Sequence, residues 1–311
     1  MARKPNATHL ILILGLILSA CTTSEQGNSS TPKEPGLAIA PDFDLQGHRG
    51  CRGLLPENSI PAFRRALELG VNTLELDLVI SRDSQVVVSH EPWLSSEICL
   101  DLEGKPIAED SHAEYNLFQM TLDEIQAYDC GSHPHERFPD QQNMPVYKPT
   151  LQQVVDSSDA YARQLGRELP FYNVEIKRVP ERDGIYHPEA GTFVLLVLNA
   201  IEEAGITDRC TVQSFDVESL QLTSQYQPAL PLVLLVENED SPEANLEKLG
   251  FVPHAYSPYF ELVDEDLVNF CDAQGMKLIP WTVNDSADIH HMIEMGTDGI
   301  ITDFPDRVPT R

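Results

Sequence analysis

Short runs of aliphatic and β-branched residues alternate with amphipathic stretches along most of the chain. Such runs predict strands, and these lie at Asp44–His48, Thr73–Ile80, Gln85–His90, Phe171–Ile176, Cys210–Ser214, Pro231–Val236, Val252–Tyr256, Lys277–Val283 and Gly299–Asp303. Apolar residues at helical spacing predict helices, and these lie at Asn58–Leu69, Pro188–Ala204, Asp216–Thr223, Ser241–Leu249, Leu262–Gln274 and Asp285–Met295. The alternation of strands with helices indicates a parallel sheet of the α/β class.

The number and size of these units favour a closed barrel. About eight strand–helix units fit the (β/α)8 TIM barrel. An open doubly wound sheet is the alternative, but no glycine-rich phosphate loop follows the first strand, as it does in many such folds. Residues 91–150 interrupt the pattern, and so long an irregular stretch is unusual inside a domain. We expect an insertion on one barrel loop, with a short helix near Thr121–Tyr128.

The first residues have the composition of an export signal. Residues 1–20 contain a basic start, then an apolar run too short to span a bilayer, then two small residues. The residues up to Cys21 resemble the lipobox of bacterial lipoproteins, which implies a lipid-anchored protein of the cell envelope, facing the periplasm or on the outer membrane. An ordinary secretory signal followed by a chance cysteine is the alternative. The polar residues 21–41 read as a flexible tether, and the folded body spans 42–311.

The charge balance restricts the partners of the protein. Acidic residues outnumber basic ones 49 to 21, which gives a formal net charge of −28. This excess argues against nucleic acid as a partner and against a polybasic membrane contact, because both require a basic surface. An anionic small-molecule substrate would therefore need a local positive feature, either a cation or a few focused basic side chains.

Five cysteines follow Cys21, and none of them has the Cys-x-x-Cys spacing of a zinc ribbon or a thioredoxin motif. Export would permit disulfides. Cys99 and Cys130 lie in the same irregular region and could be joined, which the sequence leaves open. Cys210 opens an apolar run and reads as a small buried hydrophobic residue.

Three carboxylates lie on predicted strands. Glu75 and Asp77 are two residues apart, and so are Glu175 and Lys177, so each pair faces one side of its strand. Three carboxylates directed into a barrel would repel one another and would be costly to desolvate. A divalent cation resolves this conflict, and an all-oxygen ligand set suits Ca²⁺ or Mg²⁺ better than Zn²⁺. Either pair alone would be an ordinary feature of a polar strand face.

Two histidines and two cations complete the candidate chemistry. His48 and His90 each end a predicted strand, and reactive groups of barrel enzymes lie at such ends. Imidazole donates or accepts a proton near neutral pH. Arg49 and Lys177 supply positive charge in a strongly acidic protein. Together with a metal ion, these groups have the composition needed for hydrolysis of a phosphate ester.

The order of these motifs resembles that of the glycerophosphodiester phosphodiesterase family. The matching residues are His48-Arg49-Gly50, Pro56-Glu57-Asn58-Ser59, Ala62-Phe63, Gly70, Glu75-Leu-Asp77, Asp83, His90, Glu175-Ile-Lys177, Ser214-Phe215-Asp216, Trp281-Thr-Val-Asn284, Gly296, Asp298 and Asp303-Phe-Pro305. They extend over about residues 46–307, which is nearly the whole body.

The resemblance implies a TIM-barrel phosphodiesterase that uses one divalent metal ion. It implies metal ligation by Glu75, Asp77 and Glu175. By the same resemblance, His48 and His90 would be the acid–base pair, Arg49 and Lys177 would hold the phosphate, and Trp281 would form an apolar wall near the glycerol. The implied reaction releases glycerol 3-phosphate and an alcohol. A neighbouring glycerol hydroxyl attacks phosphorus first, and water then opens the cyclic phosphate.

Two departures from the family pattern leave questions open. Glu91 follows the second histidine, where the family usually has aspartate. The insertion at 91–150 could be a lid that shapes the head-group pocket or a structural cap without ligand contacts. Phospholipase D-like action on intact or lyso phospholipids is an alternative activity, and a catalytically dead binding lipoprotein is another.

Overall fold

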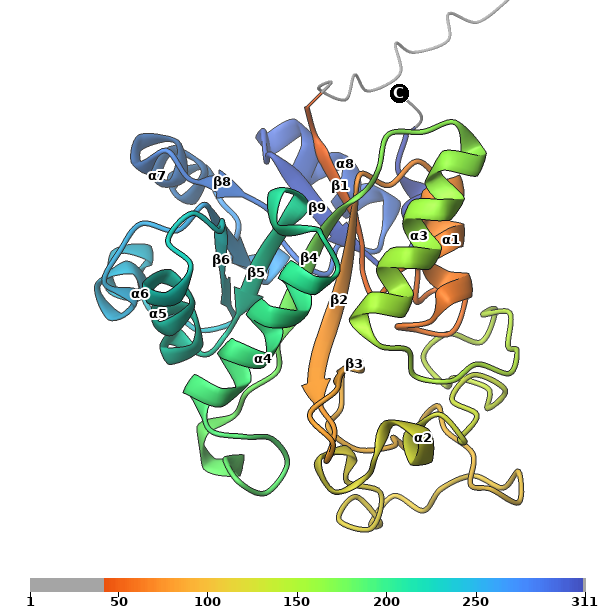
Figure 1. Ribbon diagram of the computed structural model, residues 1–311. Helices are drawn as coiled ribbons and strands as arrows, with labels where there is room; N and C mark the ends of the chain where they lie inside the picture. The colour runs from red at the N-terminus through yellow and green to blue at the C-terminus, as the bar shows by residue number, and fades with distance from the viewer. Residues whose placement is uncertain (1–41, 310–311) are drawn as a thin grey trace, which may run out of the picture. The chain divides into compact units, whose positions relative to one another are not determined.

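Eight parallel strands form a nearly closed barrel with helices between them (Figure 1). The strands are β1 (Asp44–Gly47), β2 (Thr73–Ile80), β4 (Phe171–Ile176), β5 (Cys210–Ser214), β6 (Leu232–Val236), β7 (Ala255–Pro258), β8 (Lys277–Leu278) and β9 (Gly299–Thr302). Their order is β8-β7-β6-β5-β4-β2-β1-β9. Backbone hydrogen bonds from Asp298 to Leu278 (3.0 Å) and from Ile301 to Pro280 (2.9 Å) link the two ends. The predicted barrel is therefore confirmed, and the open sheet is not.

The computed structural model describes residues 42–309, which belong to one compact unit. The predicted signal peptide, the tether and Cys21 lie outside the described residues. Within the described residues, no helix is both long and apolar enough to cross a membrane.

One predicted barrel strand is not part of the barrel. The expected strand Gln85–His90 is the short β3 (Val86–Val88), which pairs antiparallel with β2. Only residues 81–85 separate β2 from β3. A connection this short permits an antiparallel hairpin, whereas a parallel neighbour needs a crossover of about a dozen residues or more. The return strand carries the chain from the barrel into the insertion.

Seven helices cover the outside of the barrel in the described residues. They are α1 (Ile60–Glu68), α3 (Leu151–Leu165), α4 (Ala190–Glu203), α5 (Val217–Tyr226), α6 (Pro242–Leu249), α7 (Glu265–Gln274) and α8 (Ser286–Met295). The periodicity argument missed α3, which packs against α1 and α4 (Figure 1). Its sequence does carry helix signals: Thr150 and Gln153 form a capping box, and Gly166 ends the helix at a φ of 68°.

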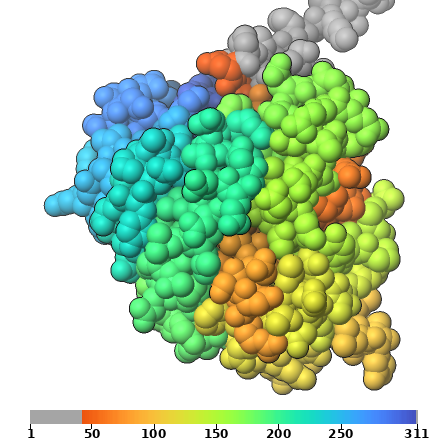
Figure 2. Space-filling view, in the orientation of Figure 1, coloured from red at the N-terminus to blue at the C-terminus, as the bar shows by residue number. Residues whose placement is uncertain are grey.

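The insertion at residues 91–150, here called the cap segment, forms the yellow part of the surface in Figure 2. Its buried residues form a small core together with Val79 and Val87 of the neighbouring hairpin. It contains a 3-10 turn (Leu117–Gln119) and the short helix α2 (Leu122–Ile125), close to the helix expected there. A disulfide joins Cys99 and Cys130, which answers the pairing question left open by the sequence. The backbone N–H of Val88 donates to Pro149 (2.7 Å), so the two ends of the cap segment leave the barrel side by side.

The interior of the barrel is divided between apolar and polar side chains. On one side Val233, Ala255, Ile279 and Ile301 form a small apolar cluster. The inward positions of β1, β2, β4 and β5 instead carry polar residues, most of them buried. The outward residues of these strands, such as Leu74, Leu76 and Leu78, belong to the main core beneath the helices. Polar and charged side chains therefore gather on one side of the barrel interior, and apolar side chains on the other.

Candidate active site

A tight turn after β1 places the first histidine and arginine. Arg49 has a φ of 49° and Gly50 a φ of 87°. A Cβ on Gly50 would lie 2.8 Å from the Ala62 carbonyl carbon, so only glycine fits against the start of α1. The backbone N–H of Arg49 donates to Glu75 Oε2 (2.8 Å), which ties the turn to β2.

The register of two strands brings the three carboxylates together. β2 and β4 pair in parallel with Asp77 opposite Glu175, and Glu75 lies one inward position earlier on β2. All three residues are buried, and one oxygen from each lies within 4.8 Å of the other two. Burial, with the charge of Asp77 added, raises the pKa of Glu75 well above its ordinary value. Burial also raises the pKa of Glu175 to about 7, although the ammonium of Lys177 opposes the shift.

These carboxylates fit a hard cation. Asp77 Oδ1 is buried and makes no hydrogen bond, which is costly for a carboxylate oxygen unless another group compensates it. The donor set consists of oxygen only, as Ca²⁺ and Mg²⁺ prefer. Residues with raised pKa values would ionise fully once a divalent charge lay between them. The three carboxylates therefore form a cluster that could hold one divalent cation.

Neighbouring amide and ammonium groups fix these side chains. Gln213 Nε2 donates to Glu75 Oε1 (2.8 Å), and Asn58 Nδ2 donates to Asp77 Oδ2 (2.8 Å). Lys177 Nζ lies 3.0 Å from Glu175 Oε1. The Gln213 amide oxygen in turn accepts from Asn173 (2.8 Å), deep inside the barrel. Each candidate ligand is thus held by a separate side chain.

His48 is oriented by an aspartate from the last strand of the barrel. His48 Nδ1 lies 2.6 Å from Asp303 Oδ1, while Nε2 faces the site 4.0 Å from Glu75 Oε2. Asp303 also accepts from Arg52 (2.9 and 3.0 Å) and from Asn284 (2.8 Å). Burial lowers the pKa of His48 to about 4, although Asp303 opposes the shift. The imidazole is therefore neutral near pH 7, with its Nε2 lone pair toward the cavity.

His90 has a similar environment on the other side of the carboxylates. Its Nδ1 lies 2.8 Å from Glu91 Oε1, and Lys177 Nζ lies 2.9 Å from its Nε2. Burial lowers the pKa of His90, and the charge of Arg49 adds to this effect. Glu91, which departs from the family pattern, thus contacts the histidine directly.

Arg49 is held in place by carboxylates before any substrate binds. Its guanidinium donates twice to Glu57 (3.0 and 2.9 Å), and its Nε lies 3.3 Å from Asp77 Oδ2. Burial raises the pKa of Glu57, but the charges of Arg49 and Arg52 outweigh it and hold that pKa at about 2. The Arg49–Glu57 pair therefore keeps the guanidinium ordered at the edge of the cavity.

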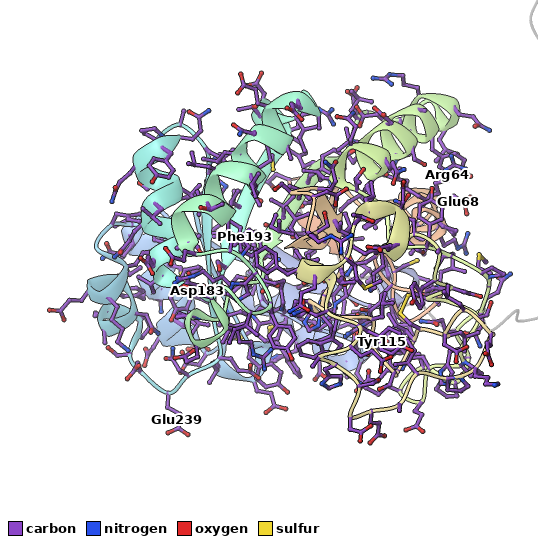
Figure 3. All side chains as sticks on the ribbon, turned by 60° about the horizontal axis from the view of Figure 1, so that its bottom comes forward. Arg64, Glu68, Tyr115, Asp183, Phe193 and Glu239 are labelled. Carbon is purple, nitrogen blue, oxygen red and sulfur yellow. A yellow bond between two sulfur atoms is a disulfide. The ribbon has the colours of Figure 1, made fainter. Side chains whose placement is uncertain are left out.

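A cavity of about 530 Å³ opens above these groups at the carboxyl ends of the strands. Aromatic side chains line its far side: Trp281 lies 5.4 Å from Phe215 and 5.9 Å from Tyr259 between ring centroids. Trp281 Nε1 donates to Ser257 O (2.9 Å), which fixes the indole. Figure 3 turns this end of the barrel towards the viewer, with Tyr115 marking the cap segment and Asp183 the loop after β4.

The structure brings all the candidate residues of the body to one place. His48, Arg49, Glu75, His90, Glu175, Lys177 and Trp281 line the cavity, and Asp77 lies buried beneath it. Sequence reasoning assigned no role to Asp303, Glu57 or Asn58, although all three belong to the motifs quoted above. It also missed Gln213, whose only signal is an inward position on β5.

Comparisons with known proteins agree with this geometry. A model described as "Glycerophosphoryl diester phosphodiesterase family" matches residues 48–307. A glycerophosphodiester phosphodiesterase of Caldanaerobacter subterraneus subsp. tengcongensis is 29% identical over 260 residues, covering 83% of this chain and 93% of the relative. A putative glycerophosphoryl diester phosphodiesterase of Silicibacter pomeroyi has a solved structure with a TM-score of 0.75 and 31% identity, covering 88% of this chain and 94% of that one.

A more distant solved structure shares the fold. It is an Oleispira antarctica phosphodiesterase in complex with the product sn-glycerol-3-phosphate. Its TM-score is 0.67 at 19% identity, and the match covers 85% of this chain and 94% of that one.

Proposed function

Because this chain belongs to the glycerophosphoryl diester phosphodiesterase family, we propose that it hydrolyses glycerophosphodiesters to glycerol 3-phosphate and an alcohol with the help of one divalent cation. The observation that carries the proposal is the meeting of two imidazoles, three carboxylates and two cations at one cavity. Glycerol 3-phosphate is also the product named for the Oleispira antarctica phosphodiesterase.

The carboxylates would bind the metal ion, and the cations would bind the phosphate. Glu75, Asp77 and Glu175 would hold Ca²⁺ or Mg²⁺, which would supply charge neutralisation on the phosphate oxygens. Arg49 and Lys177 line the same cavity and would bind those oxygens from the protein side. Their charges would also offset the repulsion of an anionic substrate by a chain of net charge −28.

The two histidines would move the protons. The glycerol hydroxyl next to the diester attacks phosphorus, and the bond from phosphorus to the alcohol oxygen breaks. One of His48 and His90, in its neutral form, accepts the hydroxyl proton, and the other, which carries a second ring proton, donates that proton to the departing alcohol. Water then opens the cyclic phosphate with the two roles exchanged, which restores both imidazoles. Each proton transfer is typically worth about 10²–10⁴-fold in rate.

A substrate and metal panel tests the proposal. Purified body residues 42–311 should release glycerol 3-phosphate from glycerophosphoglycerol with added Ca²⁺ or Mg²⁺, and EDTA should abolish the release. His48→Ala and His90→Ala should each lower kcat by at least about 100-fold, whereas His254→Ala, at the opposite end of the barrel, should not. Glu175→Gln should weaken metal binding at least about tenfold by calorimetric titration, because one charged oxygen ligand is lost.

Other outcomes would redirect the proposal. Release of the head group from lysophospholipid, without turnover of glycerophosphoglycerol, would favour the phospholipase D-like alternative. Absence of turnover on every diester with the metal bound would leave a binding protein and would overturn the proposed reaction.

We also infer from residues 1–21 that acyl chains on Cys21 anchor the mature protein in the cell envelope, facing the periplasm or on the outer membrane. Support comes from the basic start, the short apolar run and the small residues before the cysteine. Labelled palmitate should enter the wild-type protein but not Cys21→Ala. A wild-type protein that is exported, unlabelled and released from membranes would instead fit an ordinary secretory signal.

A further inference from the structure

A second cavity lies beside the first, between the cap segment and the barrel. It has a volume of about 270 Å³ and is lined by cap residues that include Trp93, Ser95 and Lys148. Arg49 and His90 line both cavities. A phosphodiester has two arms, so a phosphorus atom held near these two residues can direct one arm into each cavity.

The cations of this second cavity differ in whether they are already paired. Arg49 is bonded to Glu57, and Arg52 to Asp303. Lys148 is only 5% exposed, yet among residues 42–309 its ammonium has no hydrogen bond and no carboxylate within 4 Å. Burial of the side chain lowers the pKa of Lys148, although the charges of Glu57, Glu91 and Asp77 oppose the shift. The cavity therefore contains a positive group that lacks an anion.

A second unpaired cation stands at the junction of the two cavities. Arg137, from the cap segment, lines both of them and makes no ion pair within the described residues. Its guanidinium stacks over Phe138 at 5.6 Å from the ring centroid, which leaves its N–H donors available. Lys148 and Arg137 thus line the same cavity.

The carboxylates of this cavity do not neutralise these cations. Glu57 is bonded to Arg49, and Glu91 lies against His90. Glu97 is exposed at the rim and makes no ion pair within residues 42–309. The rim therefore offers a single acceptor for an ammonium group, while the interior offers donors for an anion.

We propose that this second cavity binds the alcohol side of the substrate and selects an alcohol that carries its own anionic group, a carboxylate or a phosphate, through Lys148 and Arg137. The inference rests on the proposed function and adds a substrate class to it. A serine head group carries both charges that this lining would select, a carboxylate for the two cations and an ammonium for Glu97.

Matched substrates test this inference. Glycerophosphoserine and glycerophosphoethanolamine differ by one carboxylate, and glycerophosphoinositol 4-phosphate and glycerophosphoinositol differ by one phosphate. Wild-type protein loaded with Ca²⁺ or Mg²⁺ should favour the anionic member of a pair by about tenfold or more in kcat/KM, as one charge-assisted hydrogen bond predicts. Preference in only one pair would support the inference and would identify the anion as carboxylate or phosphate.

Two variants test whether the preference for an anionic head group depends on the second cavity. Lys148→Met keeps the length of the buried side chain and should bring the ratio within each favoured pair close to one. Arg137→Ala, at an exposed position, should lower the ratio in a chain that folds normally. The matched control is Lys105→Met, an exposed lysine of the cap segment paired with Glu103, which should leave the ratios unchanged.

The results distinguish the two proposals. Ratios at or below one in the wild-type protein, or ratios that survive both cavity variants, would overturn the anionic subsite while the phosphodiesterase proposal stands. In that case the cap segment would be a structural cover. A protein that hydrolyses none of the four diesters would overturn the proposed function and this inference together.

Discussion

His48 and His90 come from different parts of the chain but have the same arrangement of partners. In each, Nδ1 lies within hydrogen-bond distance of a carboxylate, Asp303 or Glu91, and Nε2 faces the other candidate groups. A carboxylate at Nδ1 fixes the tautomer in which Nδ1 carries the proton. In both histidines Nε2 is then the ring nitrogen available for proton transfer at the cavity.

Asp303 should therefore act as a positioning residue. Asp303→Asn should lower kcat by about 100-fold or more with little change in KM, because the amide allows the other tautomer of His48. Steady-state kinetics on glycerophosphoglycerol, with circular dichroism to verify folding, would measure the effect. Asp306→Asn, an exposed neighbour, is the control. An unchanged kcat in a folded Asp303→Asn protein would remove this role.

At the scale of elements, the cap segment combines a separate small core with one covalent link. Its buried residues include Leu94, Ile98, Leu117 and Ile125, and the disulfide joins two members of the same cluster. Few residues form this core, and small cores contribute little stability without such a link. The cap segment should therefore depend on the disulfide more than the barrel does.

Replacing Cys99 and Cys130 together by alanine should destabilise the cap segment by about 2–4 kcal/mol, because the disulfide closes a loop in the unfolded chain. Limited proteolysis should then cut first within residues 91–150, while the circular dichroism of the barrel persists. A reducing agent should make the wild-type protein equally sensitive and should not affect the variant. Equal protease resistance of variant and wild type would show that packing alone holds the cap segment.

The sequence predicts the barrel strands well where polar and apolar positions alternate. Thr73–Ile80, Phe171–Ile176 and Cys210–Ser214 were predicted with their observed bounds. The strand expected at Lys277–Val283 ends at Leu278, because Pro280 has no N–H to continue a ladder. Helix α3 was missed because the irregular cap segment ends directly before it, although Leu151, Val154, Val155 and Ala162 recur at helical spacing.

Only part of the candidate site was predictable, because the sequence reveals local spacing but not contacts between distant residues. The spacing of Glu75 and Asp77 within one strand reveals that they share a face. The contact between His48 and Asp303 joins residues 255 positions apart, so no local pattern reveals it. Lys148 is likewise singled out only by its burial in the folded protein. The sequence around it does not indicate that burial.

At the scale of the whole molecule, excess negative charge surrounds a small group of buried cations. The net charge is −28, yet Arg49, Arg52 and Lys148 are all buried near the barrel mouth. The charges of Arg49 and Arg52 hold Glu57 in the ionised form, as its low pKa illustrates. Folding stability is thereby linked to pH at this end of the barrel.

Acid should destabilise the protein partly through Glu57. Its pKa falls from 4.5 to about 2 on folding, a shift that corresponds to about 3 kcal/mol. Since the folded value is the lower one, this stability is present above about pH 4.5 and is lost as the pH falls towards 2. Urea unfolding from pH 6 to pH 3 with EDTA should give a shallower pH dependence for Glu57→Gln than for wild type. Parallel curves would contradict the assignment.

The two ends of the cap segment leave the barrel next to each other, joined by the hydrogen bond from Val88 to Pro149. Because the two ends meet at one place, the segment between them can differ in length without moving the strands that carry the carboxylates. Transplanting the corresponding loop of a relative between Glu91 and Pro149, which leaves His90 and Glu91 in place, should therefore give a chimaera that keeps the reaction and adopts the head-group preference of the donor. In this architecture, chemistry and selectivity can evolve as separable parts.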